Sequence, residues 1–121
     1  MELKENITLP VIEEIGEGCC VQGRIPMLRS DVAEGLAGVL KALGHPVRIQ
    51  IMYILAKVGG QVCVCDIERQ FDIKQPTISH HLRLLREAGL VDAEQRGLYM
   101  YYRVTPEKLG FVRRHLKELL P

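Results

Sequence analysis

Four cysteines, arranged as two close pairs, are the side chains of this chain best suited to chemistry. Cys19 and Cys20 are adjacent, in a segment that also contains Gly18 and Gly23, and Cys63 and Cys65 are separated by one residue. Thiolates bind soft ions such as As(III), Sb(III), Cd(II) and Pb(II), and thiols are also the groups that oxidants attack. A free cysteine often simply packs as a small apolar side chain. A glycine-rich segment offers little core for that role, so ligation or redox chemistry is the stronger interpretation of the first pair.

The spacing of the second pair restricts its backbone conformation. Side chains at positions i and i+2 share a face in an extended strand but diverge on a helix. Cys63 and Cys65 can therefore meet at one ion only if their segment is extended or just entering a helix. The start of a helix would also lower the pKa of a thiol and favour the thiolate. Either cysteine packing beneath the helix is the plain alternative.

A helix–turn–helix pattern follows the second pair. The sequence predicts a short helix, a turn over 72–74, and a further helix that begins at Gln75-Pro76 and ends at Gly89. Ile78, Leu82 and Leu85 recur at i, i+4 and i+7, as one buried stripe requires. The other face carries hydrogen-bonding side chains that suit the edges of bases in a major groove: Gln75, Thr77, Ser79, His80 and Arg83. An ordinary solvent-exposed polar face is the alternative.

The flanking segments complete the predicted fold. A helix capped by Ser30 is expected over 30–43, and a helix buried on most sides is expected over 47–58, with His45 as a turn residue between them. Strands over 91–95 and 98–104 with a turn at Arg96-Gly97 form a wing, whose tip places Arg96 near phosphate or a minor groove. A last helix starts at Thr105-Pro106, with an apolar stripe at Leu109, Val112, Leu116 and Leu119. The prediction is a mainly α (α+β) winged helix–turn–helix fold with about five helices and a two-stranded wing.

Several of these segments together resemble the ArsR/SmtB family of winged-helix repressors. The motifs that carry the resemblance are Leu40–Arg48, Val62–Ile67, Gln75–Leu82 and Leu85–Val91. The resemblance implies a homodimer, paired through the first and last helices, that binds double-stranded operator DNA and leaves it when a metal or metalloid binds. It also implies that Gln75, Thr77, Ser79, His80, Arg83 and Arg96 contact DNA.

The resemblance also indicates which sensor site to expect. His115 is the only histidine of the last helix, so the family's zinc and nickel site on that helix is not favoured. The Cys-x-Cys preceding Asp66-Ile67 resembles the thiolate type, but Glu68 stands where arsenic sensors of one kind carry a further cysteine. The expected ligands are Cys19 and Cys20 of one chain with Cys65 of the other, and Cys63 is left open. As(III) or Sb(III) is favoured as effector. The alternatives are a Cd(II)- or Pb(II)-responsive repressor of the CadC type and a thiol redox or persulfide sensor.

Length and composition bound the remaining possibilities. The 121 residues suit one domain, taken as 29–121, preceded by an arm over 1–28 that carries Cys19 and Cys20. A net charge of +1 argues against a non-specific DNA coat. No apolar run approaches the ~18 residues that span a bilayer, and a secretory pattern is missing, so we expect a cytoplasmic protein without membrane partners. No catalytic triad, phosphate loop or carboxylate pair appears, and His80-His81 lie where DNA is expected. We therefore predict a regulator without an organic cofactor, not an enzyme.

Overall fold

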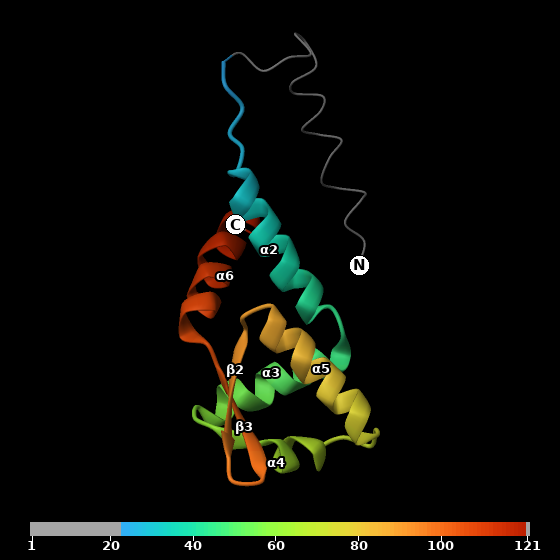
Figure 1. Ribbon diagram of the computed structural model, residues 1–121. Coiled ribbons are helices and arrows are strands. Elements are labelled where there is room, and N and C mark those ends of the chain that lie inside the picture. Colours follow the sequence, from blue (N-terminus) through green and yellow to red (C-terminus); the bar gives the residue numbers. More distant parts are fainter. Residues whose placement is uncertain (1–22, 121) are drawn as a thin grey trace.

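The computed structural model describes residues 23–120, which form five helices and one small sheet (Figure 1). The helices are α2 (Ser30–Leu43), α3 (Pro46–Val58), α4 (Val64–Glu68), α5 (Gln75–Glu87) and α6 (Pro106–Leu119). The strands are β1 (Val62–Cys63), β2 (Val91–Arg96) and β3 (Tyr99–Val104). Figure 1 shows α2 and α6 side by side at one end, and α3, α4, α5 and the hairpin at the other. The predicted winged helix–turn–helix class is confirmed.

Helix boundaries follow from local chemistry. His45 is the N-cap of α3, where its Nδ1 accepts a hydrogen bond from the Val47 backbone N–H at 3.1 Å. Proline occupies the first turn of α3, α5 and α6, where its missing N–H has no helical partner. The predicted cap at Ser30 is wrong. Arg29 is the N-cap of α2, and the Asp31 carboxylate accepts from the Val32 N–H instead.

The sheet has three antiparallel strands in the order β1-β3-β2. The hairpin of β2 and β3 is the predicted wing, and Gly97 allows its turn with φ of 63°. Arg96 belongs to β2, so the turn lies one residue later than predicted. β1 was not predicted as a strand. It pairs Val62 with Tyr102 and Cys63 with Tyr101, which joins the cysteine segment directly to the wing.

The core is organised around α5. Its predicted stripe of Ile78, Leu82 and Leu85 is fully buried. The stripe belongs to one cluster with apolar side chains from the other elements, including Leu36, Val39, Ile51, Leu55, Ile67, Leu90 and Val112. α3 differs from the prediction, because Ile49, Tyr53 and Val58 are exposed on it. Among the described residues, no helix is long and apolar enough to cross a membrane.

Candidate functional site

Cys63 and Cys65 bring their sulfur atoms together at the junction of β1 and α4. Cys63 is the extended N-cap of α4, with φ of −65° and ψ of 139°, and Cys65 is the second helical residue. The two Sγ atoms lie 2.6 Å apart, and the Cys65 backbone N–H donates to Cys63 Sγ at 3.4 Å. The backbone thus changes from strand to helix between Cys63 and Cys65. This is one of the two conformations in which their side chains were predicted to meet. The pair presents two soft donors to one ion.

The electrostatics of the pair differ from the prediction. The pKa of Cys65 is raised, first by the hydrogen bond with the Cys63 thiol and then by burial and the nearby charges of Cys63 and Asp66, while Arg69 opposes the shift. A lowered pKa was expected from a helix start. α4 has only five residues, so its dipole is small, and the neighbouring thiol favours the protonated form. The hydrogen bond with Cys63 therefore favours the thiol form of Cys65 over the thiolate.

Two sulfur donors from the described part of the chain meet at this position. Within residues 23–120, no group of three or more His, Cys, Asp or Glu side chains is close enough to hold an ion. The other predicted ligands, Cys19 and Cys20, lie outside the described residues. The soft donor set fits As(III), Sb(III), Cd(II) or Pb(II), and a third ligand has to come from beyond this cluster.

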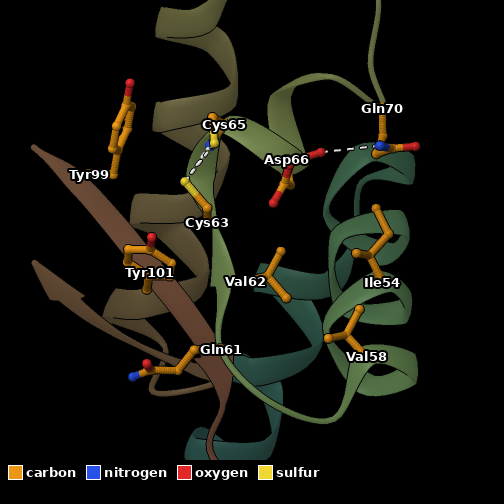
Figure 2. A pocket seen from close by; sticks show the side chains of 10 residues that line it. All are labelled: Ile54, Val58, Gln61, Val62, Cys63, Cys65, Asp66, Gln70, Tyr99 and Tyr101. Carbon is orange, nitrogen blue, oxygen red and sulfur yellow. Dashed lines mark hydrogen bonds between the residues drawn. The ribbon is translucent and has the colours of Figure 1, made fainter. Parts of the chain in front are cut away.

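A cavity of about 630 Å³ opens beside the two sulfurs (Figure 2). We call it the thiol cavity. Ile54 and Val58 of α3 line one side, and Tyr99 and Tyr101 of β3 line the other, with the cysteines between them in Figure 2. The remaining lining residues are Gln61, Val62, Asp66 and Gln70. The walls are mainly aliphatic and aromatic, and no pattern in the sequence indicated that they meet.

The predicted DNA-reading side chains share the solvent-exposed face of α5. All five are exposed: Gln75, Thr77, Ser79, His80 and Arg83. Arg83 lies 2.9 Å from His80 Nδ1 and 3.7 Å from the Glu87 carboxylate, so its guanidinium is held on this face without being buried. The arrangement presents hydrogen-bond donors and acceptors along the first three turns of the helix, as groove recognition requires.

The expectation that His80 and His81 both lie where DNA binds is wrong for His81. His81 is only 6% exposed and points to the interior. Its Nδ1 lies 3.0 Å from Arg48 Nη1, and its ring centroid lies 4.4 Å from that of His45. The pKa of His81 is lowered, chiefly by burial and then by the charges of His45, Arg48 and His80. A neutral His81 imidazole whose Nδ1 accepts a hydrogen bond from Arg48 accounts for both the close contact and the lowered pKa.

Arg48 connects three helices through this cluster. Its Nε donates to the carbonyl of Ala42 near the end of α2, while its Nη1 reaches His81 on α5. Sequence reasoning missed this role, although Arg48 stands in a motif with His45 and Pro46. The orientation of α5 is thereby tied to the end of α2 and the start of α3.

Arg96 stands near the tip of the wing, exposed to solvent as predicted. Its guanidinium carbon lies 4.5 Å from the ring centroid of Tyr101, a cation–π contact. Tyr101 is also the residue paired with Cys63 across β1 and β3. One tyrosine therefore lies between the thiol pair and the wing arginine.

Comparison with known sequences points to one family. Residues 45–93 match the family described as "Bacterial regulatory protein, arsR family". An uncharacterized HTH-type transcriptional regulator of Methanocaldococcus jannaschii is 37% identical over 86 residues, which are 71% of this chain and 96% of that protein. The arsenical resistance operon repressor of Bacillus subtilis is 38% identical over 58% of this chain and 66% of its own. A cadmium resistance regulatory protein, a CadC homolog of Staphylococcus aureus, is 35% identical over 70% and 64%.

Solved structures agree with the sequence matches. A possible transcriptional regulator for arsenical resistance superimposes with a TM-score of 0.63 at 30% identity, over 69% of this chain and 85% of that one. The transcriptional repressor BigR from Xylella fastidiosa gives a TM-score of 0.57 at 36% identity, over 73% and 92%. These relatives are transcriptional regulators, and none of their names describes an enzyme.

Proposed function

This chain belongs to the arsR family of bacterial regulatory proteins, and we propose that it is a dimeric repressor that releases operator DNA when cysteine thiolates bind As(III) or Sb(III). The observation that carries the proposal is the 2.6 Å approach of Cys63 Sγ and Cys65 Sγ at the entrance to the helix–turn–helix. Soft trivalent ions are well suited to binding by such a pair of sulfur donors.

The arm over 1–28 supplies the remaining ligand in this proposal. Arsenite binds three thiolates, and its three As–O bonds are replaced by As–S bonds while each thiol proton leaves as water. Cys63 and Cys65 give two of the three sulfurs. Cys19 or Cys20, from the partner subunit, gives the third. Binding would then tie the arm of one protomer to the segment that leads into α5 of the other.

The dimer is formed through α2 and α6, with 29–121 as the DNA-binding and dimerisation domain. The N-terminal approach to α2 and the end of α6 carry exposed apolar side chains, namely Ile25, Met27, Leu28, Leu119 and Leu120. Covering them with a second copy would remove this apolar surface from water. A two-fold dimer then presents two α5 helices to half-sites about one helical turn of DNA apart.

Operator contact is assigned to the exposed face of α5 and to the wing. Gln75, Thr77 and Ser79 lie in the first turns of α5, with His80 and Arg83 next to them. Arg96 reaches phosphate or the minor groove from the wing. Effector binding must favour a dimer geometry in which the spacing of these surfaces no longer matches the operator DNA. The coupling free energy between effector and DNA is typically ~1–3 kcal/mol.

The coupling is tested by measuring arsenite affinity with and without operator DNA. Linkage requires the DNA to weaken arsenite binding by the same factor by which arsenite weakens DNA binding. Operator release is followed by fluorescence anisotropy on the wild type, on Cys63→Ser, on Cys65→Ser and on a Cys19→Ser, Cys20→Ser double variant. Equal arsenite affinities in the two conditions would refute the proposal. An arsenite response that survives in the double variant would remove the arm from the site.

A thiol redox sensor is the second candidate, favoured by the closeness of the two sulfurs. Peroxide would oxidise Cys63 and Cys65 to a disulfide and be reduced to two waters, without any ion. The test is operator release by peroxide in the presence of a chelator, and its reversal by a dithiol reductant. A Cd(II)- or Pb(II)-responsive repressor is separated from the arsenite sensor by the same titration carried out with those ions.

A further inference from the structure

We propose that Leu98, in the turn of the wing, enters the minor groove of the operator as an apolar wedge between two base pairs. Operator preference then depends on how easily that base step unstacks, and not only on the base edges that α5 contacts. The inference rests on the proposed binding of operator DNA and adds a specificity-determining residue to it. Leu98 is 91% exposed, more than any other large hydrophobic side chain in the described part of the chain, and it is outside the core cluster.

The turn of the wing has an unusual composition for a hairpin connection. Arg96 is paired with Tyr99, so Gly97 and Leu98 alone connect the two strands. Gly97 is typical of such a turn and adopts a φ of 63°. Asn, Asp, Ser or a second Gly usually accompanies it, because these residues tolerate the turn backbone or hydrogen-bond to it. Leucine makes no such hydrogen bond and keeps an aliphatic side chain in water, so the fold does not explain its presence.

The side chain of Arg96 is directed away from the tip of the wing. Its guanidinium carbon lies 4.5 Å from the ring centroid of Tyr101, whose partner on β2 is Glu94, two residues before Arg96. Arg96 therefore extends back along the hairpin. Figure 1 shows the turn at the end of the molecule opposite α2 and α6. When this end approaches DNA, Leu98 is the foremost side chain, and Arg96 lies on the flank of the wing, where it can meet phosphate.

The charges of the turn favour DNA as the partner of Leu98. No aspartate or glutamate occurs from Gln95 to Val104, and Arg96 places a positive charge next to the turn. The phosphate backbone therefore attracts this part of the wing. Leucine is one of the apolar side chains that proteins insert between base pairs from the minor groove, which unstacks them and bends the duplex. Pyrimidine–purine steps such as TA deform most easily, so the wing should favour operators that carry one where Leu98 enters.

Unstacking of the operator is the direct test. The DNA is a duplex that the wild-type protein selects from random sequences in the absence of effector. 2-Aminopurine, whose fluorescence rises when a base unstacks, is placed in turn at each position flanking the segments that α5 protects. The wild type should raise the fluorescence at one flanking step of each half-site, and Leu98→Ala should not. Persistence of the signal in Leu98→Ala overturns the inference, and so does an unchanged fluorescence when the wild type binds.

Affinities for duplexes with TA or GC at that step distinguish a wedge from a charge contact. By fluorescence anisotropy, the wild type should prefer TA by about tenfold, and Leu98→Ala should lose most of this preference. The slope of log affinity against log salt should stay the same, because no charge is removed. Equal affinities of the wild type and Leu98→Ala for both duplexes would overturn the inference and leave Leu98 to a protein partner.

Three matched variants define the effect. Leu98→Met keeps a long apolar side chain and should retain the unstacking and the TA preference. Ile49→Ala removes an exposed aliphatic side chain from α3, outside the wing, and should behave as the wild type. Arg96→Ala should show the reverse pattern, with a smaller salt slope and the TA preference retained. If arsenite releases the operator and no base step unstacks, the inference fails while the proposed function stands. A wild type that selects no duplex overturns both.

Discussion

Protonation of His81 should loosen the packing of α5 at mildly acidic pH. In the structure its Nδ1 accepts from Arg48 Nη1 at 3.0 Å, and the centroid of its ring lies 4.4 Å from that of His45. Imidazolium has no acceptor nitrogen, so a proton on His81 would set donor against donor and cation against cation. His80 on the same helix adds to this repulsion when it is charged.

The sign and size of the effect follow from the lowered pKa of His81. Above pH ~6.5 the side chain is neutral in both the folded and the unfolded protein, and this group leaves stability unchanged. Below that pH the unfolded chain takes up the proton first, so the free energy of unfolding falls as pH falls. The loss levels off once pH is below the folded pKa. For one histidine it is at most about 1.4 kcal/mol at pH 5.5.

Urea unfolding at pH 7.5 and pH 5.5, at one fixed protein concentration, measures this loss. His81→Gln keeps an amide oxygen for Arg48 but cannot titrate, so its stability should change less between the two pH values than that of the wild type. His115→Gln, on α6, is the control and should keep the wild-type difference, because His115 is not among the groups that lower the pKa of His81. If His81→Gln and the wild type lose the same free energy, the neutral, accepting state of His81 is wrong.

Three further predictions test the core, the wing and a turn. Leu82→Ala, at a fully buried position of α5, should lower the free energy of unfolding by ~2–5 kcal/mol in urea denaturation, and a loss below ~1 kcal/mol would contradict the packing. Arg96→Ala should weaken operator binding across sequences and reduce the slope of log affinity against log salt by about 1, and an unchanged slope would remove Arg96 from the phosphate contacts. Gly89→Ala should cost about 1 kcal/mol in thermal or urea unfolding, because φ is 79° and a Cβ would lie 3.0 Å from Lys108 Cε; a stabilised variant would disprove the strain.

Patterns of short range were sufficient to predict the helix–turn–helix and the wing. The i, i+4, i+7 recurrence of Ile78, Leu82 and Leu85 located the buried face of α5, and the alternation after Arg96-Gly97 located the hairpin. Both signals are local properties of the chain, and the structure confirms both. The strand β1 is too short to show a period of its own, since it consists of Val62 and Cys63. It exists because β3 offers an edge to pair with.

Features that depend on distant residues were not predictable. His81 was treated as equivalent to His80, yet the two point in different directions because one step around a helix rotates the side chain by about 100°. The role of Arg48 required the end of α2 and the middle of α5 to be placed together. The thiol cavity likewise requires α3 and β3 to flank the cysteines. The spacing of Cys63 and Cys65 predicted their convergence, but the raised pKa of Cys65 depends on the hydrogen bond that this convergence creates.

The two-residue pairing of β1 with β3 couples the position of the cysteine segment to that of the wing, so that the two should move together. Cys63 of β1 is paired with Tyr101 of β3, and the ring of Tyr101 makes the cation–π contact with Arg96. A ligand that draws the backbone of Cys63 inward would pull on the hairpin before it disturbs α5. Substitutions near the tip of the hairpin, at residues that do not line the thiol cavity, should in turn alter how tightly a ligand is held by the cysteines.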